Sequence, residues 1–316
     1  MINLNCALVL FTVCRNLITR LRATFLKRII PFDSHISMHF LTAGCIVFWT
    51  FVHVTAHYFN LHSLQKYTAG KRTMWQSAFL TGTGFTGHIM LLSLVIMIAT
   101  SFKLFRHKFF HIFWNVHHLS ILFIAVGMIH GAFCFIKSDT ADACHGGPGF
   151  WKWTLGSFGV YLFERLLRVY RARQETSILK VIQHPSQVFQ VQIRKPSLNA
   201  KSGQYIYICC PEISKTEWHP FTLTSSPSED FISVHIRVAG DWTKKFAKRL
   251  GCVFDKKNGI PIVNTLLPEI KVDGPYGSAS EDVYDYDVSV IIGAGIGVVC
   301  SLDTRLTLDR HPLHLS

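Results

Sequence analysis

Residues 36–59 read ISMHFLTAGCIVFWTFVHVTAHYF, an apolar run with the length of a helix that crosses a bilayer. The run carries His39 and His53, fourteen residues apart. At about 1.5 Å and about 100° per helical residue, the two lie about 21 Å apart along the axis and within about 40° of one face. Ionisable side chains are costly inside a bilayer, so this pair predicts a functional site.

A second apolar run, at 111–133, also carries two histidines, thirteen residues apart. If both runs cross in the same direction, each histidine of one run lies at the depth of a histidine of the other. Two opposed histidines at each of two depths are the arrangement that binds two stacked b-type haems through imidazole nitrogens. The predicted iron ligands are His39 and His117 for the lower haem, and His53 and His130 for the upper haem.

This arrangement makes one demand on the second helix. A straight α-helix would leave His117 and His130 about 140° out of phase. The helix is therefore expected to tighten or kink between them, near Gly127. The neighbouring His118 does not remove the difficulty.

Three further apolar runs, at roughly 3–19, 78–101 and 150–168, also have the length of membrane helices. Lysines and arginines gather after the run at 3–19, between the runs at 78–101 and 111–133, and after the run at 150–168. The positive-inside rule places these loops in the cytosol. Much of the formal charge of +13 is thereby explained without nucleic acid. A first crossing that starts outside, so close to Met1, suggests that a preceding helix is missing.

Three more side chains of the membrane part are candidate site residues. Arg15 and Arg22 lie seven residues apart on the inner half of the first run. Arg22 suits the headgroup region, whereas the deeper Arg15 needs an anion, for which a haem propionate would serve. His57, one turn beyond His53, is expected at the outer edge of the upper haem, placed to donate a proton to whatever receives the electron there.

From about residue 175 the chain takes on the character of a soluble domain rich in strands. Phe231–Val238 alternates apolar and polar residues, which is typical of a half-buried strand. Repeated short strands with Pro and Gly between them predict a small antiparallel barrel. The other expected elements are strands at 177–183, 187–194, 203–210 and 219–225, and a helix at 243–250.

Four short motifs follow in this half. They are W-H-P-F-T-L-T-S-S-P at 218–227, H-I-R-V-A-G-D-W-T at 235–243, D-G-P-Y-G at 273–277, and G-A-G-I-G-V at 293–298 after an apolar strand at 288–292. The first is extended, so alternate side chains can face an isoalloxazine ring. Arg237 can neutralise a pyrophosphate, and Thr243 begins a helix whose backbone N–H groups also receive phosphate. The glycine-rich string after a strand is typical of a nicotinamide-binding phosphate loop.

With the spacing of the four histidines, these strings resemble the Nox family of NADPH oxidases, especially its phagocyte type, from residue 2 to 298. The resemblance implies a multi-domain membrane protein. Its expected parts are an α-helical transmembrane haem-binding bundle at 1–173 that lacks the family's first helix, a ferredoxin-reductase-type β-barrel FAD domain at 174–286, the start of an incomplete α/β nucleotide-binding domain at 287–298, and a divergent tail at 299–316.

The resemblance also implies the cofactors and their contacts. The cofactors are two b-type haems, FAD and NADPH. The residues expected to contact FAD are Trp218, His219, Pro220, Phe221, Thr222, Leu223, Thr224, Ser225, His235, Arg237, Trp242 and Thr243, and those expected to contact NADPH are Gly293, Gly295, Ile296 and Gly297.

The implied function is electron transfer from cytosolic NADPH through FAD, the lower haem and the upper haem to dioxygen outside, which becomes superoxide. The implied partners are dioxygen, membrane lipid, cytosolic regulatory proteins and a small membrane subunit. Nucleic acid is not expected among them. The expected location is a plasma membrane or endomembrane, with the FAD domain in the cytosol. A ferric-chelate reductase and a non-catalytic truncated isoform remain as alternatives, and the chain as given is not expected to oxidise NADPH at a useful rate.

Overall fold

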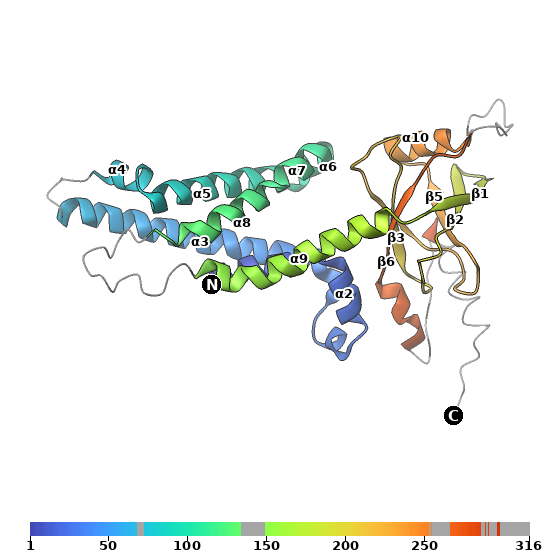
Figure 1. The fold of residues 1–316 in the computed structure, drawn as a ribbon, viewed down its shortest axis with the longest axis horizontal. Coiled ribbons are helices and arrows are strands. Elements are labelled where there is room, and N and C mark those ends of the chain that lie inside the picture. Colours follow the sequence, from blue (N-terminus) through green and yellow to red (C-terminus); the bar gives the residue numbers. More distant parts are fainter. Residues whose placement is uncertain are drawn as a thin grey trace. The chain divides into compact units, whose positions relative to one another are not determined.

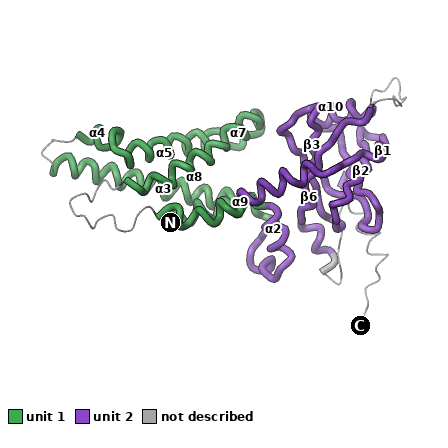
Figure 2. The backbone as a smooth tube through the Cα atoms, in the orientation of Figure 1, with its two compact units in different colours: residues 1–14, 34–161 green, residues 15–33, 162–316 purple. Residues whose placement is uncertain are grey.

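The computed structural model describes residues 1–67, 73–133, 149–252, 254, 266–285, 288, 290 and 296–297. The chain divides into two compact units, Met1–Cys14 with Ser34–Tyr161, and Arg15–Asp33 with Leu162–Ser316 (Figure 2). Below they are called unit 1 and unit 2. Residues 15–33 were expected in the membrane part, yet their contacts assign them to the unit that holds the strands.

Unit 1 is helical (Figure 1). Its helices are α1 (Ile2–Phe11), α3 (His35–Tyr67), α4 (Met74–Phe79), α5 (Gly82–Ser101), α6 (Lys103–Lys108), α7 (Phe110–His117), α8 (Leu119–His130) and the first part of α9 (Phe150–Ala172). Helix α5 packs against α7 and α8, and α1 packs against α3. Thr81 caps α5, its hydroxyl accepting a hydrogen bond from the Gly84 N–H at 3.1 Å, which satisfies one of the free donors of the first turn.

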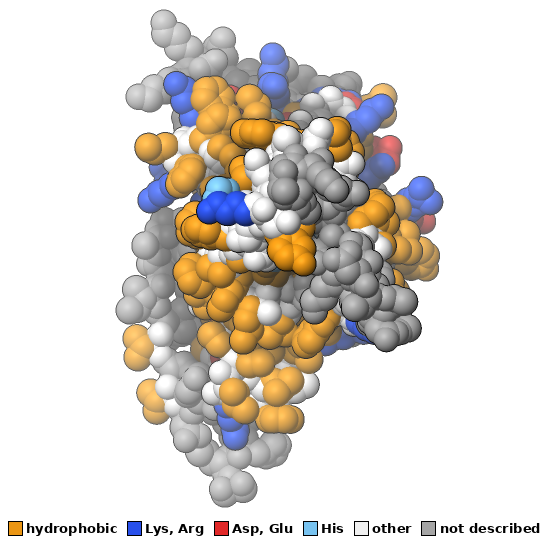
Figure 3. All heavy atoms as spheres, turned by 90° about the vertical axis from the view of Figure 1, so that its left-hand side faces the viewer, with side chains coloured by type: hydrophobic (Ala, Val, Ile, Leu, Met, Phe, Trp, Pro, Cys, Tyr) orange, Lys and Arg blue, Asp and Glu red, His pale blue; other side chains and the backbone are white. Residues whose placement is uncertain are grey.

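The outer surface of these helices is apolar. On α3, Leu41 and Phe51 are each 70% exposed. Exposing such apolar side chains costs free energy in water but not in lipid. Figure 3 shows hydrophobic side chains gathered over much of this face of the molecule. Three helices are long and apolar enough to cross a membrane, at Phe32–Tyr67, Gly82–Ser101 and Phe110–His130.

Two of the five expected spans differ from the expectation. The run at 3–19 is not one helix, because α1 ends at Phe11 and α2 (Arg15–Arg22) begins after a break; only the bent pair taken together would count as a fourth span. The run at 150–168 does form a helix, α9, but Lys152, Glu164 and Arg165 interrupt its apolar sequence, and it does not reach the same hydropathy.

The expected tightening of the second histidine helix is present at another place. The helix breaks at His118, between α7 and α8, where the His118 N–H donates to the Asn115 carbonyl, three residues back, at 3.2 Å. The expected position near Gly127 is wrong. Gly127 serves close packing instead, because an added Cβ would lie 2.9 Å from the Phe150 ring.

Unit 2 contains two antiparallel three-stranded sheets. One has the order β1 (Ser177–His184), β2 (Val188–Arg194), β5 (Ile232–Arg237), and the other has the order β4 (His219–Thr222), β3 (Tyr205–Cys209), β6 (Lys271–Tyr276). An isolated bridge between Leu223 and Val234 links them. The prediction of short antiparallel strands is confirmed. Strand β6 was not expected, because its central Gly274–Pro275 pair is typical of a turn.

The alternation in β5 places Ile232, Val234 and Ile236 in the core, as expected. Helix α10 (Asp241–Arg249) covers that core with Trp242 and Phe246, both buried. It begins two residues before the predicted start, at the point where the Gly240 N–H donates to the Thr243 hydroxyl at 3.0 Å. The 3₁₀ segment η4 (Ala279–Asp285) follows β6.

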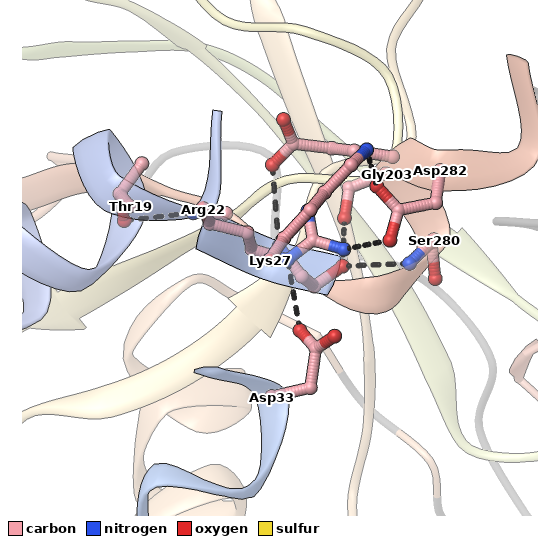
Figure 4. Close-up of polar contacts among 10 residues, drawn as sticks. Thr19, Arg22, Lys27, Asp33, Gly203, Ser280 and Asp282 are labelled. Atoms are coloured by element: carbon pink, nitrogen blue, oxygen red, sulfur yellow. Dashed lines mark hydrogen bonds and ion pairs between the residues drawn. The ribbon is translucent and has the colours of Figure 1, made fainter. Parts of the chain in front are cut away.

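Residues 15–33 join the rest of unit 2 through charge pairs around the buried Arg22 (Figure 4). Arg22, 5% exposed, donates to Asp33 at 2.9 Å and to Asp282 of η4 at 2.5 Å. Lys27 adds a second ion pair to Asp282 at 3.2 Å, and the Gly277 N–H donates to the Thr19 hydroxyl at 3.1 Å. A carboxylate that faces two cations keeps the buried guanidinium compensated.

Two further buried groups complete this contact. Glu164 of α9 accepts hydrogen bonds from the backbone N–H groups of Asn16 and Leu17, at 3.2 and 2.7 Å, and so caps the N-terminus of α2. Asp273 of β6 accepts from Arg168 at 2.8 Å and from the Tyr276 hydroxyl at 2.7 Å. These bonds tie the second part of α9 and α2 to the sheet.

Replacing Asp282 by Ala is expected to destabilise unit 2 by about 1.5–3 kcal/mol, because buried Arg22 loses a charged hydrogen-bond partner. Thermal unfolding followed by tryptophan fluorescence would measure the change. Asp230→Ala, at an exposed aspartate of the same unit, is the matched control. Equal unfolding temperatures for the two variants would contradict the prediction.

Candidate functional site

The structure brings together the two histidine pairs that the sequence predicts. The ring centroids of His39 and His117 are 6.2 Å apart, and those of His53 and His130 are 6.3 Å apart. Helix α3 supplies one member of each pair, and α7 and α8 supply the other. All four belong to unit 1.

These separations fit an iron between the rings. With metal–nitrogen bonds of about 2 Å and a further distance of about 1 Å from each nitrogen to its ring centre, the centroids would be about 6 Å apart. Within the described part of the chain, no group of three or more His, Cys, Asp or Glu residues could hold a metal ion. A metal held by two protein ligands needs its other ligands from a prosthetic group, as a bis-histidine haem provides.

One histidine of each pair also has a hydrogen bond to a threonine that the sequence did not reveal. The Thr12 hydroxyl lies 2.9 Å from Nδ1 of His39, and the Thr86 hydroxyl lies 2.8 Å from Nδ1 of His130. Both threonines are buried. No local pattern could have identified them, because each contact joins two helices that are distant in sequence.

A cavity of about 580 Å³ surrounds the upper pair, a volume within the usual range of cofactor sites. Its lining includes His53, His57 and His130, and most of the other lining side chains are apolar. The His57 ring centroid lies 4.4 Å from that of His53, as expected from their spacing. Gly87 keeps the space open, because an added Cβ would lie 3.1 Å from the His130 ring.

The two arginines have partners inside unit 2. The Arg15 guanidinium lies 4.3 Å from the ring centroid of Tyr207, a cation–π contact. Arg22 is held by the carboxylates of Asp33 and Asp282. The expected contact of these arginines with a haem propionate therefore stays a prediction.

In unit 2, three of the residues predicted to contact FAD form an aromatic cluster. The His219 ring stacks on Trp242 at 4.2 Å, and Phe221 lies 6.1 Å from the same indole. The Trp242 Nε1–H is buried and has no hydrogen-bond partner among the described residues. Because buried donors are normally paired, this orphan fits a site for a bound ligand.

A polar group lies on the adjoining strands. The Thr224 hydroxyl lies 2.7 Å from Nδ1 of His235 and 3.0 Å from the Ser233 hydroxyl. Burial, together with the neighbouring His184, lowers the pKa of His235 to about 4. His235 is therefore neutral at pH 7 and acts here as a hydrogen-bonding group, not as a cation.

The other predicted flavin residues fall into three groups. Pro220, Thr222 and Arg237 are exposed and free to meet a ligand, while Trp218 is half-buried. Leu223 and Ser225 are buried, and the Ser225 hydroxyl accepts from the Ser233 N–H at 3.0 Å, so both serve the fold. The Thr243 hydroxyl accepts from the Gly240 N–H at 3.0 Å at the N-terminus of α10.

Most of the expected nucleotide loop lies outside the described residues. This holds for Gly293 and Gly295, and for most of the expected strand at 288–292. Ile296 and Gly297 are described only as a two-residue fragment. Their assignment to NADPH stays a prediction.

Comparisons with known proteins agree with both halves. Residues 2–128 match the family described as "Ferric reductase like transmembrane component", and residues 173–280 match the family described as "FAD-binding domain". A superoxide-generating NADPH oxidase heavy chain of Dictyostelium discoideum is 39% identical over 94% of this chain and 59% of its own length. NADPH oxidase 1 of Mus musculus is 35% identical over 94% and 59%, and NADPH oxidase 3 of Homo sapiens is 34% identical over 94% and 62%.

A helical membrane unit with two histidine pairs, in one chain with antiparallel sheets of the FAD-binding type, defines a multi-pass membrane flavoprotein of the ferric-reductase-like class. The comparisons support b-type haem and FAD as its cofactors. The chain is similar to NADPH oxidases over 94% of its length. It spans about three fifths of the length of these relatives, 59% for the first two.

Replacing His53 by Ala is expected to halve the haem content and to leave a lower haem that dithionite still reduces, since each haem needs both imidazoles. Haem per protein and the reduced-minus-oxidised spectrum would measure this. His62→Ala, at an exposed histidine of the same helix, is the control and should keep both haems. Full haem content in His53→Ala and in His130→Ala would remove these assignments.

Replacing Arg237 by Ala is expected to weaken FAD binding by about 1.5–3 kcal/mol, the value of a hydrogen bond to a charged group, with haem content unchanged. Titration of flavin fluorescence would give the dissociation constant. The control is Arg194→Ala, at an exposed arginine that ends β2 of the same sheet. If both variants bind FAD equally well, Arg237 is only a surface residue.

Proposed function

We propose that this chain carries electrons from NADPH through FAD and two b-type haems to dioxygen, which is reduced to superoxide. The observation that carries the proposal is the pair of histidine separations, 6.2 and 6.3 Å, on apolar helices. The names of two relatives, which describe superoxide-generating NADPH oxidases, agree with it.

The chain's own residues hold the cofactors. His39 and His117 would hold the lower haem, and His53 and His130 the upper one. The haems and FAD, when bound, supply the redox chemistry. The cavity around the upper pair has a mostly apolar lining, and the proposal gives His57 the role of proton donor to reduced oxygen at that level.

For FAD, the proposal assigns the exposed strand residues to the ring and the cationic end of β5 to the phosphates. Pro220 and Thr222 lie on the outward face of β4, where an isoalloxazine ring can lie flat. The unpaired Trp242 Nε1–H offers a donor nearby. Arg237 offers a planar fork to the pyrophosphate. The NADPH phosphates would meet the glycine loop at 293–297.

The proposal extends to partners. From the family resemblance alone, the further partners proposed are cytosolic regulatory proteins and a small membrane subunit. Exposed side chains such as Phe48 and Phe51 on α3 offer an apolar surface for such a protein or for lipid. The hydrocarbon core of a bilayer would cover these apolar side chains as well as a protein surface would.

A second candidate is a ferric-chelate reductase, favoured by the match of residues 2–128 to a ferric-reductase-like component. A test that needs no NADPH separates the two. The chain, loaded with haem and FAD, is reduced by dithionite under argon and then mixed with dioxygen or with ferric chelate. Superoxide dismutase-sensitive trapping of superoxide, faster than ferrous chelate formation, is expected. Ferrous iron formed rapidly without superoxide would overturn the oxidase proposal.

A further inference from the structure

We infer that Thr12 and Thr86 are positioning residues of the two haem sites. Each hydroxyl accepts a hydrogen bond from Nδ1–H of one axial histidine and so leaves the Nε2 lone pair of that ring for iron. The inference rests on the proposed haem-binding function and goes beyond it, since it assigns the tautomer and the orientation of the ligands to two further residues.

The lower site shows the arrangement at the end of α1. The Thr12 hydroxyl lies 2.6 Å from the carbonyl oxygen of Val9 and 2.9 Å from Nδ1 of His39. A carbonyl oxygen can only accept, so the single hydroxyl proton is committed to Val9. The hydroxyl therefore meets the ring with a lone pair, and Nδ1 of His39 must carry the proton.

The upper site repeats this logic on a different helix. The Thr86 hydroxyl lies 2.6 Å from the Gly82 carbonyl oxygen and 2.8 Å from Nδ1 of His130. Its proton is likewise committed to a carbonyl, so Nδ1 of His130 is the donor. Thr12 is 8% exposed and Thr86 is 6% exposed, so both hydroxyls that meet the rings are buried.

The chemical consequence follows from neutral imidazole. It has one N–H and one lone pair, so a proton fixed on Nδ1 makes Nε2 the metal ligand. An acceptor on the far nitrogen of a ligating histidine also fixes the ring orientation and raises the basicity of the ligand. His117, the partner of His39, has a buried Nδ1 without a hydrogen-bond partner among the described residues. The lower pair thus has one ring held by a hydroxyl and one held by packing.

The hydroxyl-to-carbonyl bonds alone would mean little, because threonines in helices often bond the preceding turn. Two other threonines of unit 1, on α3 and α5, provide a comparison. The Thr42 hydroxyl on α3 bonds the Met38 and His39 carbonyls, at 2.9 and 3.0 Å. Thr100 on α5 bonds the Ile96 and Met97 carbonyls, both at 3.1 Å. Neither hydroxyl bonds an imidazole of the described residues, so both serve as matched controls.

The test compares Thr12→Val and Thr86→Val with Thr42→Val and Thr100→Val in the full chain carrying haem. Valine keeps the shape and removes the acceptor. Each test variant is expected to lose one of its two haems to apomyoglobin about 10-fold faster or more, the usual effect of removing an outer partner of a metal ligand. The midpoint potential of that one haem should also rise, because its ligand is less electron-rich. Thr12→Ser and Thr86→Ser should restore both values.

The outcomes separate the inference from the proposed function. If the valine test variants match their controls in haem release and midpoint potential, with two haems per chain, the inference is overturned and the haem sites stand. If the serine variants fail as the valine variants do, the hydroxyl is not the cause and the inference is also overturned. If the parent chain binds no bis-histidine haem, as judged by its low-spin electron paramagnetic resonance signal, the proposed function fails first.

Discussion

The opposition of two imidazole pairs inside an apolar helical unit is the constraint on which the rest of unit 1 depends. Four imidazoles on helices apolar enough to cross a membrane are costly unless a ligand satisfies them. Their ring separations near 6 Å match a shared metal. The break at His118 follows from the same constraint, because thirteen residues of straight helix would turn His117 and His130 to different faces. The small residues Gly87 and Gly127 then allow the close approach of neighbouring side chains.

Unit 2 is organised by a different interaction, the compensation of buried charge. Three charged side chains, Arg22, Glu164 and Asp273, are each about 5% exposed or less. Each of them has a charged or hydrogen-bonding partner. Breaking such pairs leaves an uncompensated charge, so they specify one arrangement more than they add to stability. The flavin-binding strands are therefore built on a base whose geometry is fixed by directional bonds.

Much of this could be read from local patterns. The histidine spacing predicted both pairs, and the alternation in Phe231–Val238 predicted a strand whose apolar face lies in the core. The misses have physical reasons. The run at 3–19 looked continuous because hydropathy does not register the break after Phe11, and β6 was missed because its Gly274–Pro275 pair is typical of a turn.

By itself the sequence indicated three of the apolar helices, the histidines that share a depth, and the strand that alternates, because hydropathy and periodicity along a segment record each of these. Tertiary structure alone decided that Thr12 faces His39, that Thr86 faces His130, and that Asp282 holds Arg22. Those partners are 27, 44 and 260 residues apart in the chain. Such contacts arise from how helices and loops pack, and packing depends on shape and bond direction over distances that no local periodicity records.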